Sequence, residues 1–128
     1  MSEGPADEGV LASGVELVEV AEAERLLAAG GGGVFTEVEL RYARGRVDPG
    51  RRLAARLAAK RAARRLLGGT ASEGEIEVWR GEYGPPSLRL SGAARERMHA
   101  LGAGRALVSL THERAHAAAL VVLARDER

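Results

Sequence analysis

The spacing of hydrophobic and polar residues changes several times along the chain, and each change indicates a new element of secondary structure. Short apolar or alternating runs are typical of strands, and longer stretches with apolar residues every three or four positions are typical of helices. The pattern predicts strands over residues 14–20, 76–80, 87–90, 106–110 and 117–123. It predicts helices over residues 21–29, 36–44, 49–67 and 93–101.

Turn and capping residues mark where several of these elements begin and end. Thr36 and Glu39 are spaced as a capping box, in which Thr36 accepts from a backbone amide three residues on and Glu39 reaches back. The Asp-Pro-Gly turn at residues 48–50 introduces the longest helix, and the glycine pair at residues 68–69 ends it. His112 is predicted to lie in the turn between the last two strands.

The composition is that of one ordinary globular domain. The chain has 128 residues, 45% hydrophobic and 29% charged, which is enough to bury a modest core. We expect a disordered lead-in over residues 1–9, one domain over residues 10–124 and a tail over residues 125–128.

The absence of cysteine excludes disulfides and thiolate sites. No apolar run reaches the roughly 18 residues of a membrane span, and no signal-peptide pattern is visible, so a cytoplasmic protein is expected.

The charges are unevenly placed, although the formal net charge is only +1. Arginines are concentrated between Arg41 and Arg65, and on a helix Arg56, Lys60 and Arg64 share one face. Such a stripe is a possible track for nucleic-acid phosphates, but the chain is nearly neutral and carries no base-reading or aromatic stacking set. Alanine fills much of the apolar face, which argues against a membrane-surface helix. Neither a nucleic-acid nor a membrane partner is expected.

Three short motifs are more specific than these patterns. Residues 14–19 read GVELVE in the first predicted strand, residues 56–62 read RLAAKRA in the longest helix, and residues 109–112 read SLTH. Together they resemble the signature of the holo-acyl-carrier-protein synthases, the small phosphopantetheinyl transferases. In that family the corresponding motifs usually read G-I/V-D-I/L-V-E, R-F-A-A-K-E-A and S-I/L-S/T-H.

The resemblance extends over most of the chain. Residues 35–40 (FTEVEL) match a family segment F/L-T-x-x-E-L/I, residues 84–90 (GPPSLRL) resemble its G-x-P-x-L/I-x-L/F hairpin, and residues 117–119 match its A-x-A. Each motif alone is weak, but their common order and spacing are specific. The resemblance implies an α+β phosphopantetheinyl-transferase fold, with an antiparallel sheet packed against helices in a single domain. It also implies a homotrimer with active sites between neighbouring subunits.

Members of the family transfer the phosphopantetheine arm of coenzyme A to a serine of apo acyl carrier protein, in fatty acid or polyketide synthesis. The resemblance therefore implies coenzyme A as the donor substrate, apo acyl carrier protein as the partner and magnesium as the metal. The metal would neutralise the pyrophosphate, and a positive surface would receive the acidic carrier protein. Arg25, Arg41 and Arg44 are candidates for that surface.

The resemblance assigns roles to five positions. Glu16 stands where the family has its metal-binding Asp, and is the candidate metal ligand. Lys60 and His112 match outright as catalytic candidates, and Arg65 replaces a catalytic-site lysine. These three, with Arg56, are also the candidates for contact with coenzyme A phosphates. The alternative for Arg56 and Lys60 is a solvated helix face, and for His112 a loop histidine that caps a strand end.

One position departs from the family pattern by a reversal of charge. Arg61 stands where the family has its second metal ligand, a Glu, and a guanidinium cannot ligate a cation. Two interpretations are open. In the first, Arg61 binds phosphate in place of the metal, and transfer is retained with altered metal dependence. In the second, Arg61 pairs with Glu16 in an inactive site, and the chain is a silent member that binds coenzyme A, acyl carrier protein or an active paralogue.

Overall fold

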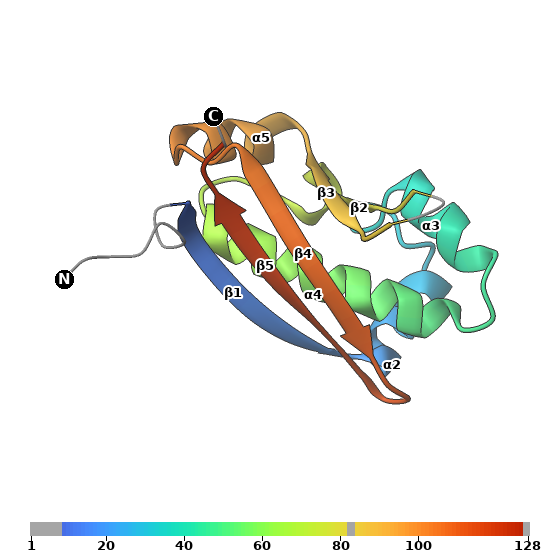
Figure 1. Ribbon diagram of the computed structural model, residues 1–128. Helices are drawn as coiled ribbons and strands as arrows, with labels where there is room; N and C mark the ends of the chain where they lie inside the picture. Colours follow the sequence, from blue (N-terminus) through green and yellow to red (C-terminus); the bar gives the residue numbers. More distant parts are fainter. Residues whose placement is uncertain (1–8, 82–83, 127–128) are drawn as a thin grey trace.

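The computed structural model describes residues 9–81 and 84–126, and its centre is one long helix packed across a sheet (Figure 1). The described elements, in chain order, are strand β1 (Val10–Glu19), helices α2 (Val20–Ala28), α3 (Glu37–Arg44) and α4 (Pro49–Leu67), the 3-10 helix η1 (Glu73–Glu75), strands β2 (Ile76–Trp79) and β3 (Ser87–Leu90), helix α5 (Gly92–Ala100), and strands β4 (Arg105–His112) and β5 (His116–Ala124). Apart from Gly9, the expected lead-in lies outside the described residues, as does the end of the expected tail.

The main sheet is antiparallel, with strands in the order β1-β5-β4, and β2 and β3 form a separate antiparallel pair. Along each strand of the main sheet, successive side chains point to opposite faces. On β1, Val18 points toward α4 and is buried, whereas Val15 and Leu17 point away from it and are 60% and 66% exposed. The antiparallel sheet packed with helices that the resemblance implies is confirmed.

Helix α4 lies close to the sheet because most of its inward side chains are small. Its buried alanines are Ala54, Ala55, Ala58, Ala59, Ala62 and Ala63. Leu53, Leu57 and Leu67 fill the remaining space and are almost completely buried. A helix that is apolar on most sides belongs in a core, and α4 is most exposed near its end, at Arg64 and Arg65.

Most predicted elements are confirmed, and their ends differ by at most two residues except at the start of β1. The capping box of α3 forms as predicted, and α4 has the predicted bounds. Strand β1 begins at Val10, before the predicted start, because its first residues pair with the end of β5. The predicted position of His112 in a turn is wrong, because β4 extends to that residue and pairs it with Ala117.

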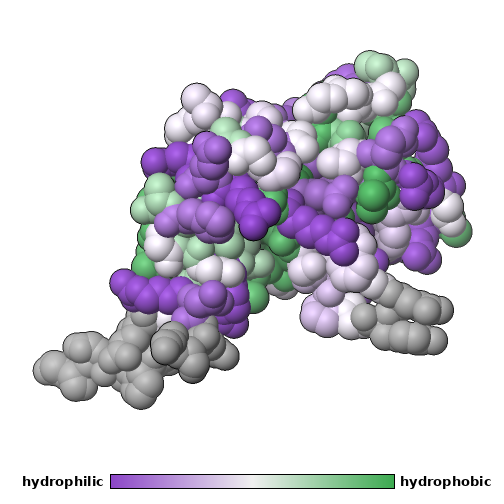
Figure 2. All heavy atoms as spheres, turned by 90° about the horizontal axis from the view of Figure 1, so that it is seen from above, coloured by the Kyte–Doolittle hydropathy of each residue, from purple (hydrophilic) through white to green (hydrophobic). Residues whose placement is uncertain are grey.

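One face of the main sheet carries no helix among the described elements, and it is the face turned toward the viewer in Figure 1. Its exposed hydrophobic side chains are Val15, Leu17, Leu107 and Leu120. In the view of Figure 2, by contrast, hydrophilic side chains cover much of the surface and hydrophobic ones form small patches. No helix of the described chain has the length and apolar character needed to cross a membrane.

Candidate functional site

A hollow of about 410 Å³ lies where the last turns of α4 face β1. Its lining residues are Glu16, Arg61, Arg64, Arg65, Gly68, Gly69 and Glu73. The three arginines reach this surface because α4 turns its alanines and leucines toward the core. The structure therefore brings together three of the positions singled out in the sequence, Glu16, Arg61 and Arg65. We call this the charged hollow.

Glu16 is held by Arg65, which lies along β1. The Nη1 atom of Arg65 donates to the Glu16 carboxylate, and Nη2 donates to the carbonyl oxygen of Val15 at 3.1 Å. Gly14 makes room for this arrangement, because a Cβ atom at that position would lie 3.0 Å from Arg65 Nη2. The glycine of the GVELVE motif thus lets the arginine approach the strand.

Arg61 pairs with Glu22 of helix α2, so the predicted pairing with Glu16 is wrong. Its Nη1 and Nη2 atoms donate to the two carboxylate oxygens of Glu22 at 3.1 and 2.5 Å. These hydrogen bonds raise the pKa of Arg61 and lower the pKa of Glu22. Glu22 was missed in the sequence because 39 positions separate it from Arg61 and no motif links them.

The remaining arginine of the charged hollow is paired as well. Arg64 Nη1 lies 2.9 Å from a carboxylate oxygen of Glu73. Both carboxylates that line the hollow, those of Glu16 and Glu73, are therefore matched by an arginine. Within residues 9–81 and 84–126, no group of three or more His, Cys, Asp or Glu side chains is placed to hold a metal ion. This donor set does not fit magnesium, which prefers carboxylate, phosphate and water oxygens at close to octahedral geometry.

Lys60 lies in the core and not in the charged hollow. Its Nζ atom is 2.7 Å from Glu39 Oε1, and both side chains are fully buried. Nζ also donates to the carbonyl oxygens of Glu73 and Ile76, at 3.0 and 2.5 Å. Burial lowers the pKa of Lys60, while the Glu39 carboxylate opposes that change. The solvated helix face considered for Lys60 is wrong.

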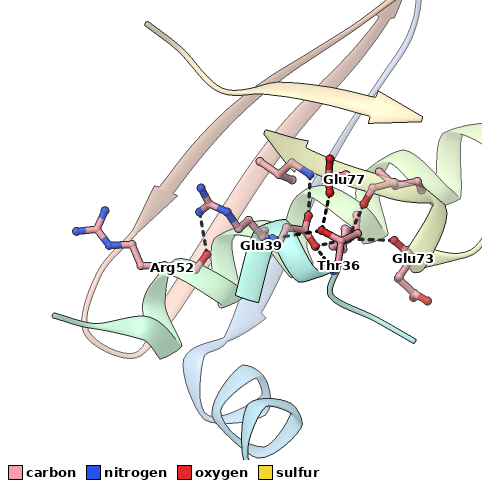
Figure 3. A network of polar contacts seen from close by, with 9 residues as sticks. Thr36, Glu39, Arg52, Glu73 and Glu77 are labelled. Carbon is pink, nitrogen blue, oxygen red and sulfur yellow. Dashed lines mark hydrogen bonds and ion pairs between the residues drawn. The ribbon is translucent and has the colours of Figure 1, made fainter. Parts of the chain in front are cut away.

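Glu39 connects the buried Lys60 to the N-terminus of α3 and to β2 (Figure 3). Its carboxylate accepts from the backbone amide of Thr36 at 2.9 Å and from that of Val78 at 2.7 Å. The hydroxyl of Thr36 donates to Glu77 at 2.7 Å. The capping-box glutamate therefore has a second function that the sequence pattern did not indicate, because it compensates a buried lysine.

Arg56 is also buried and lies apart from the charged hollow. Its guanidinium stacks over the ring of Tyr42 at 4.1 Å and donates to the carbonyl oxygen of Arg52 at 3.2 Å. Burial lowers the pKa of Arg56. Among the described residues, the Nε atoms of Arg52 and Arg56 have no hydrogen-bond partner. A second hollow, of about 400 Å³, opens here between Tyr42, Arg46, Arg52, Arg80 and Gly81.

The burial of Arg56 and Lys60 also bears on the stripe of basic residues considered for nucleic acid. Only 3% of Arg56 and none of Lys60 is exposed. The face that these residues were predicted to share with Arg64 is therefore interrupted at two of its three positions. A continuous basic track along α4 is not formed.

His112 lies at the end of β4, away from Glu16. It is exposed and contributes to a hollow of about 380 Å³. The other lining residues are Leu17, Thr111, Glu113, His116, Ala117 and Ala118. His112 is not among the residues that line the charged hollow, and strand β5 lies between its strand and β1.

Comparison with known proteins supports the resemblance, although no family model matches the chain. The chain is 38% identical over 124 residues to the holo-[acyl-carrier-protein] synthase of Moorella thermoacetica, over 89% of this chain and 94% of that protein. It is 43% identical over 119 residues to the holo-[acyl-carrier-protein] synthase of Thermus thermophilus, a match that covers 89% of this chain and 93% of that protein. Among solved structures, a holo-(acyl-carrier-protein) synthase from Bacillus anthracis in complex with CoA (3',5'-ADP) matches with a TM-score of 0.75. That match has 26% identity and covers 92% of this chain and 99% of the other.

These likenesses span nearly the whole length of the related proteins, so they concern the complete domain and not an isolated motif. The fold is that of the small α+β proteins of the phosphopantetheinyl-transferase class. Within this class, the chain belongs to the holo-acyl-carrier-protein synthase family.

Proposed function

We propose that this chain transfers the phosphopantetheine arm of coenzyme A to a serine of apo acyl carrier protein, with residues 10–124 as the transferase domain. The observation that carries the proposal is the charged hollow, which places Arg61, Arg64 and Arg65 beside Glu16. Two of the three short family motifs contribute to it, GVELVE through Glu16 and RLAAKRA through Arg61. Three guanidinium groups at one surface suit a pyrophosphate, since guanidinium binds phosphate oxygens bidentately.

The proposed reaction needs the chain to hold the pyrophosphate and to admit a serine. The serine oxygen forms a bond to the phosphorus that bears the pantetheine arm. The bond from that phosphorus to the bridging oxygen breaks, and the adenosine bisphosphate leaves with the electron pair. The serine proton passes to water. Arg64 and Arg65 hold the phosphate oxygens and stabilise the charge that develops on them.

A homotrimer is part of the proposal, and the uncovered face of the main sheet supports it. Val15 and Leu17 expose more than half of their surface there, and Leu107 and Leu120 continue the apolar patch. His112 shares a hollow with Leu17 of this face, and in the proposed trimer it would reach a phosphate bound by a neighbouring subunit. Leu17→Arg is expected to convert the oligomer to monomers in sedimentation velocity, and Leu101→Arg, on a different surface, is the matched control.

Two further assignments belong to the same proposal. Arg25, Arg41 and Arg44 are all exposed and would face the acidic carrier protein. The setting would be cytoplasmic. Reversal of charge at Arg41 should raise the KM for the carrier protein and leave the affinity for coenzyme A unchanged.

The second candidate is a silent family member that binds coenzyme A or acyl carrier protein without transfer. It is favoured by the ion pairs of Glu16 and Glu22, which occupy two of the three arginines of the charged hollow. In this alternative Glu16, Arg61 and Arg65 hold the structure together and take no part in a reaction.

Mass spectrometry of an apo acyl carrier protein incubated with the chain and coenzyme A separates the two candidates. The incubation should be done with magnesium and with a chelator, and with wild type and Arg61→Glu in parallel. A phosphopantetheine adduct formed by wild type establishes transfer. An adduct formed only by Arg61→Glu with magnesium identifies wild type as a silenced synthase. No adduct from either protein, together with measurable coenzyme A binding, supports the silent binding protein.

A further inference from the structure

An ion pair at the rim of the charged hollow, between Arg61 and Glu22, can exchange one anion for another. We infer that the pyrophosphate of the donor binds here without a metal ion, by displacing the Glu22 carboxylate from Arg61. Arg61 then supplies the positive charge at the position where the family places its second metal ligand. This inference rests on the proposed function, because it specifies how the donor is held.

The geometry of the Arg61–Glu22 pair suits such an exchange. Two parallel hydrogen bonds, at 3.1 and 2.5 Å, join the guanidinium to both carboxylate oxygens. A phosphate offers the same pair of acceptor oxygens to the same fork of donors. About a third of each side chain is exposed, 35% for Arg61 and 36% for Glu22, so a ligand reaches the pair from solvent.

The lining of the charged hollow, which does not include Glu22, favours an anion over a cation. Three arginines and two glutamates line the charged hollow, so the lining carries a net charge of +1 (three positive and two negative). Arg64 and Arg65 expose about half of their side chains, 52% and 55%, and can add to a site for a polyanion. A magnesium ion would have to separate Glu16 from Arg65 and remain beside Arg61.

The rim of the charged hollow leaves room for a ligand to approach the backbone. Gly68 has φ = +68°, a conformation that other residues rarely adopt, and a Cβ atom there would meet open space. Gly68 and Gly69 follow directly on the last turn of α4, which carries Arg64 and Arg65. A phosphate can thus lie against Gly68 while the arginines hold its oxygens, whereas the side chain of Arg97 lies against Gly69.

The exchange makes Glu22 an internal competitor of the ligand. Glu22→Gln removes the competing charge and keeps the shape of the side chain, so Arg61 becomes more available to phosphate. Glu24→Gln is the matched control, because Glu24 lies on the same helix and against Gly50, not in the charged hollow. Arg95→Glu on α5 is the control for Arg61→Glu, since Arg95 is exposed and on another surface.

The test is isothermal titration calorimetry with coenzyme A and, separately, with inorganic pyrophosphate, each in chelator and in magnesium. Wild type is expected to bind both ligands in chelator, with little gain from magnesium. Arg61→Glu should weaken binding in chelator by about tenfold or more, the size typical of a lost charge-assisted hydrogen bond. Glu22→Gln should tighten binding by about threefold to tenfold, and both control variants should bind as wild type does.

The outcomes distinguish the inference from the function on which it rests. Binding of coenzyme A by wild type that requires magnesium overturns the metal-free site and leaves the transferase proposal standing. Equal affinities of wild type, Arg61→Glu and Glu22→Gln in chelator also overturn it. Metal-free binding that depends on Arg61, without transfer to a carrier protein, supports the inference and overturns the transferase. The absence of any coenzyme A binding overturns both.

Discussion

Two neighbouring residues of α4, Lys60 and Arg61, belong to regions with opposite properties. Lys60 is fully buried and paired with Glu39 in the core, whereas Arg61 is partly exposed and paired with Glu22 at the rim of the charged hollow. Successive residues of a helix point about 100° apart, so one motif can serve both regions. The difference teaches that neighbouring positions in one motif need not share one role, since here one pairs in the core and the next faces the charged hollow, the proposed ligand site.

The two ion pairs also differ in what they contribute to stability. A buried ammonium and carboxylate have lost their hydration, and removal of one partner leaves an uncompensated charge in the core. An exposed pair stays partly hydrated and contributes little. An ion pair that contributes little to the stability of the fold can be broken by a ligand while the chain stays folded. The Arg61–Glu22 pair meets this condition, and the Lys60–Glu39 pair does not.

The largest expected effect is on the buried pair. Lys60→Met should lower the free energy of unfolding by about 3–5 kcal/mol, because the Glu39 carboxylate remains buried without its cation. The carbonyl oxygens of Glu73 and Ile76 also lose a donor. Urea denaturation at neutral pH measures the change.

Two matched variants test whether this loss comes from the buried charge. Arg64→Met removes an exposed partner from the same helix and should change the free energy of unfolding by less than about 1 kcal/mol. The double variant Glu39→Gln/Lys60→Met removes both charges and should recover part of the loss. If Lys60→Met were no more destabilising than Arg64→Met, the contrast between the two regions would be wrong.

The sequence predicted much of the fold but only part of the site. Elements with local signals were predictable, such as α3 with its Thr36 cap and α4 between its proline and its glycines. Glu16, Arg61 and Arg65 were also found, because family motifs mark their positions. The partners of these residues were not predictable, since Glu22 and Arg61 lie 39 positions apart and meet only in the folded chain.

Burial was the second property that the sequence concealed. Lys60 and Arg56 are charged and follow a helical spacing, which indicates a solvated face unless their partners are known. Glu39 was recognised as a helix cap, and its pairing with Lys60 depends on how α3 packs against α4 and β2. Such a tertiary pairing leaves no periodic signal in one sequence.

An intermediate effect is expected from Gly14→Ala, which acts on the charged hollow without touching a charged residue. The new Cβ atom would lie 3.0 Å from Arg65 Nη2, and the flexible arginine would move away from Val15 and Glu16. Coenzyme A affinity should fall by about threefold to tenfold, as one charge-assisted contact is misplaced. The free energy of unfolding should change little, because a flexible side chain yields.

Calorimetric binding and urea denaturation of the same Gly14→Ala sample separate these two effects. Gly32→Ala is the control, since a Cβ atom there meets nothing within 4 Å and the backbone conformation is ordinary. A loss of stability with unchanged affinity would show that Gly14 serves packing against Leu66 and not the position of Arg65.

The smallest expected effect is the pH dependence of the Arg61–Glu22 pair. The hydrogen bonds from Arg61 hold the pKa of Glu22 below its ordinary value, which is about 4.3. The pair therefore stabilises the folded chain fully above about pH 4.3 and loses this contribution as the pH falls through the lowered pKa.

Arg61→Met should reduce the free energy of unfolding by less than about 1 kcal/mol near neutral pH. In more acidic solution, urea denaturation curves of the variant and wild type should converge, because protonated Glu22 no longer gains from Arg61. Arg95→Met should follow wild type at every pH. A difference that persists in acid would mean that the stem of Arg61 stabilises the chain by packing, and the pair would then be less readily exchanged for a phosphate than its exposure suggests.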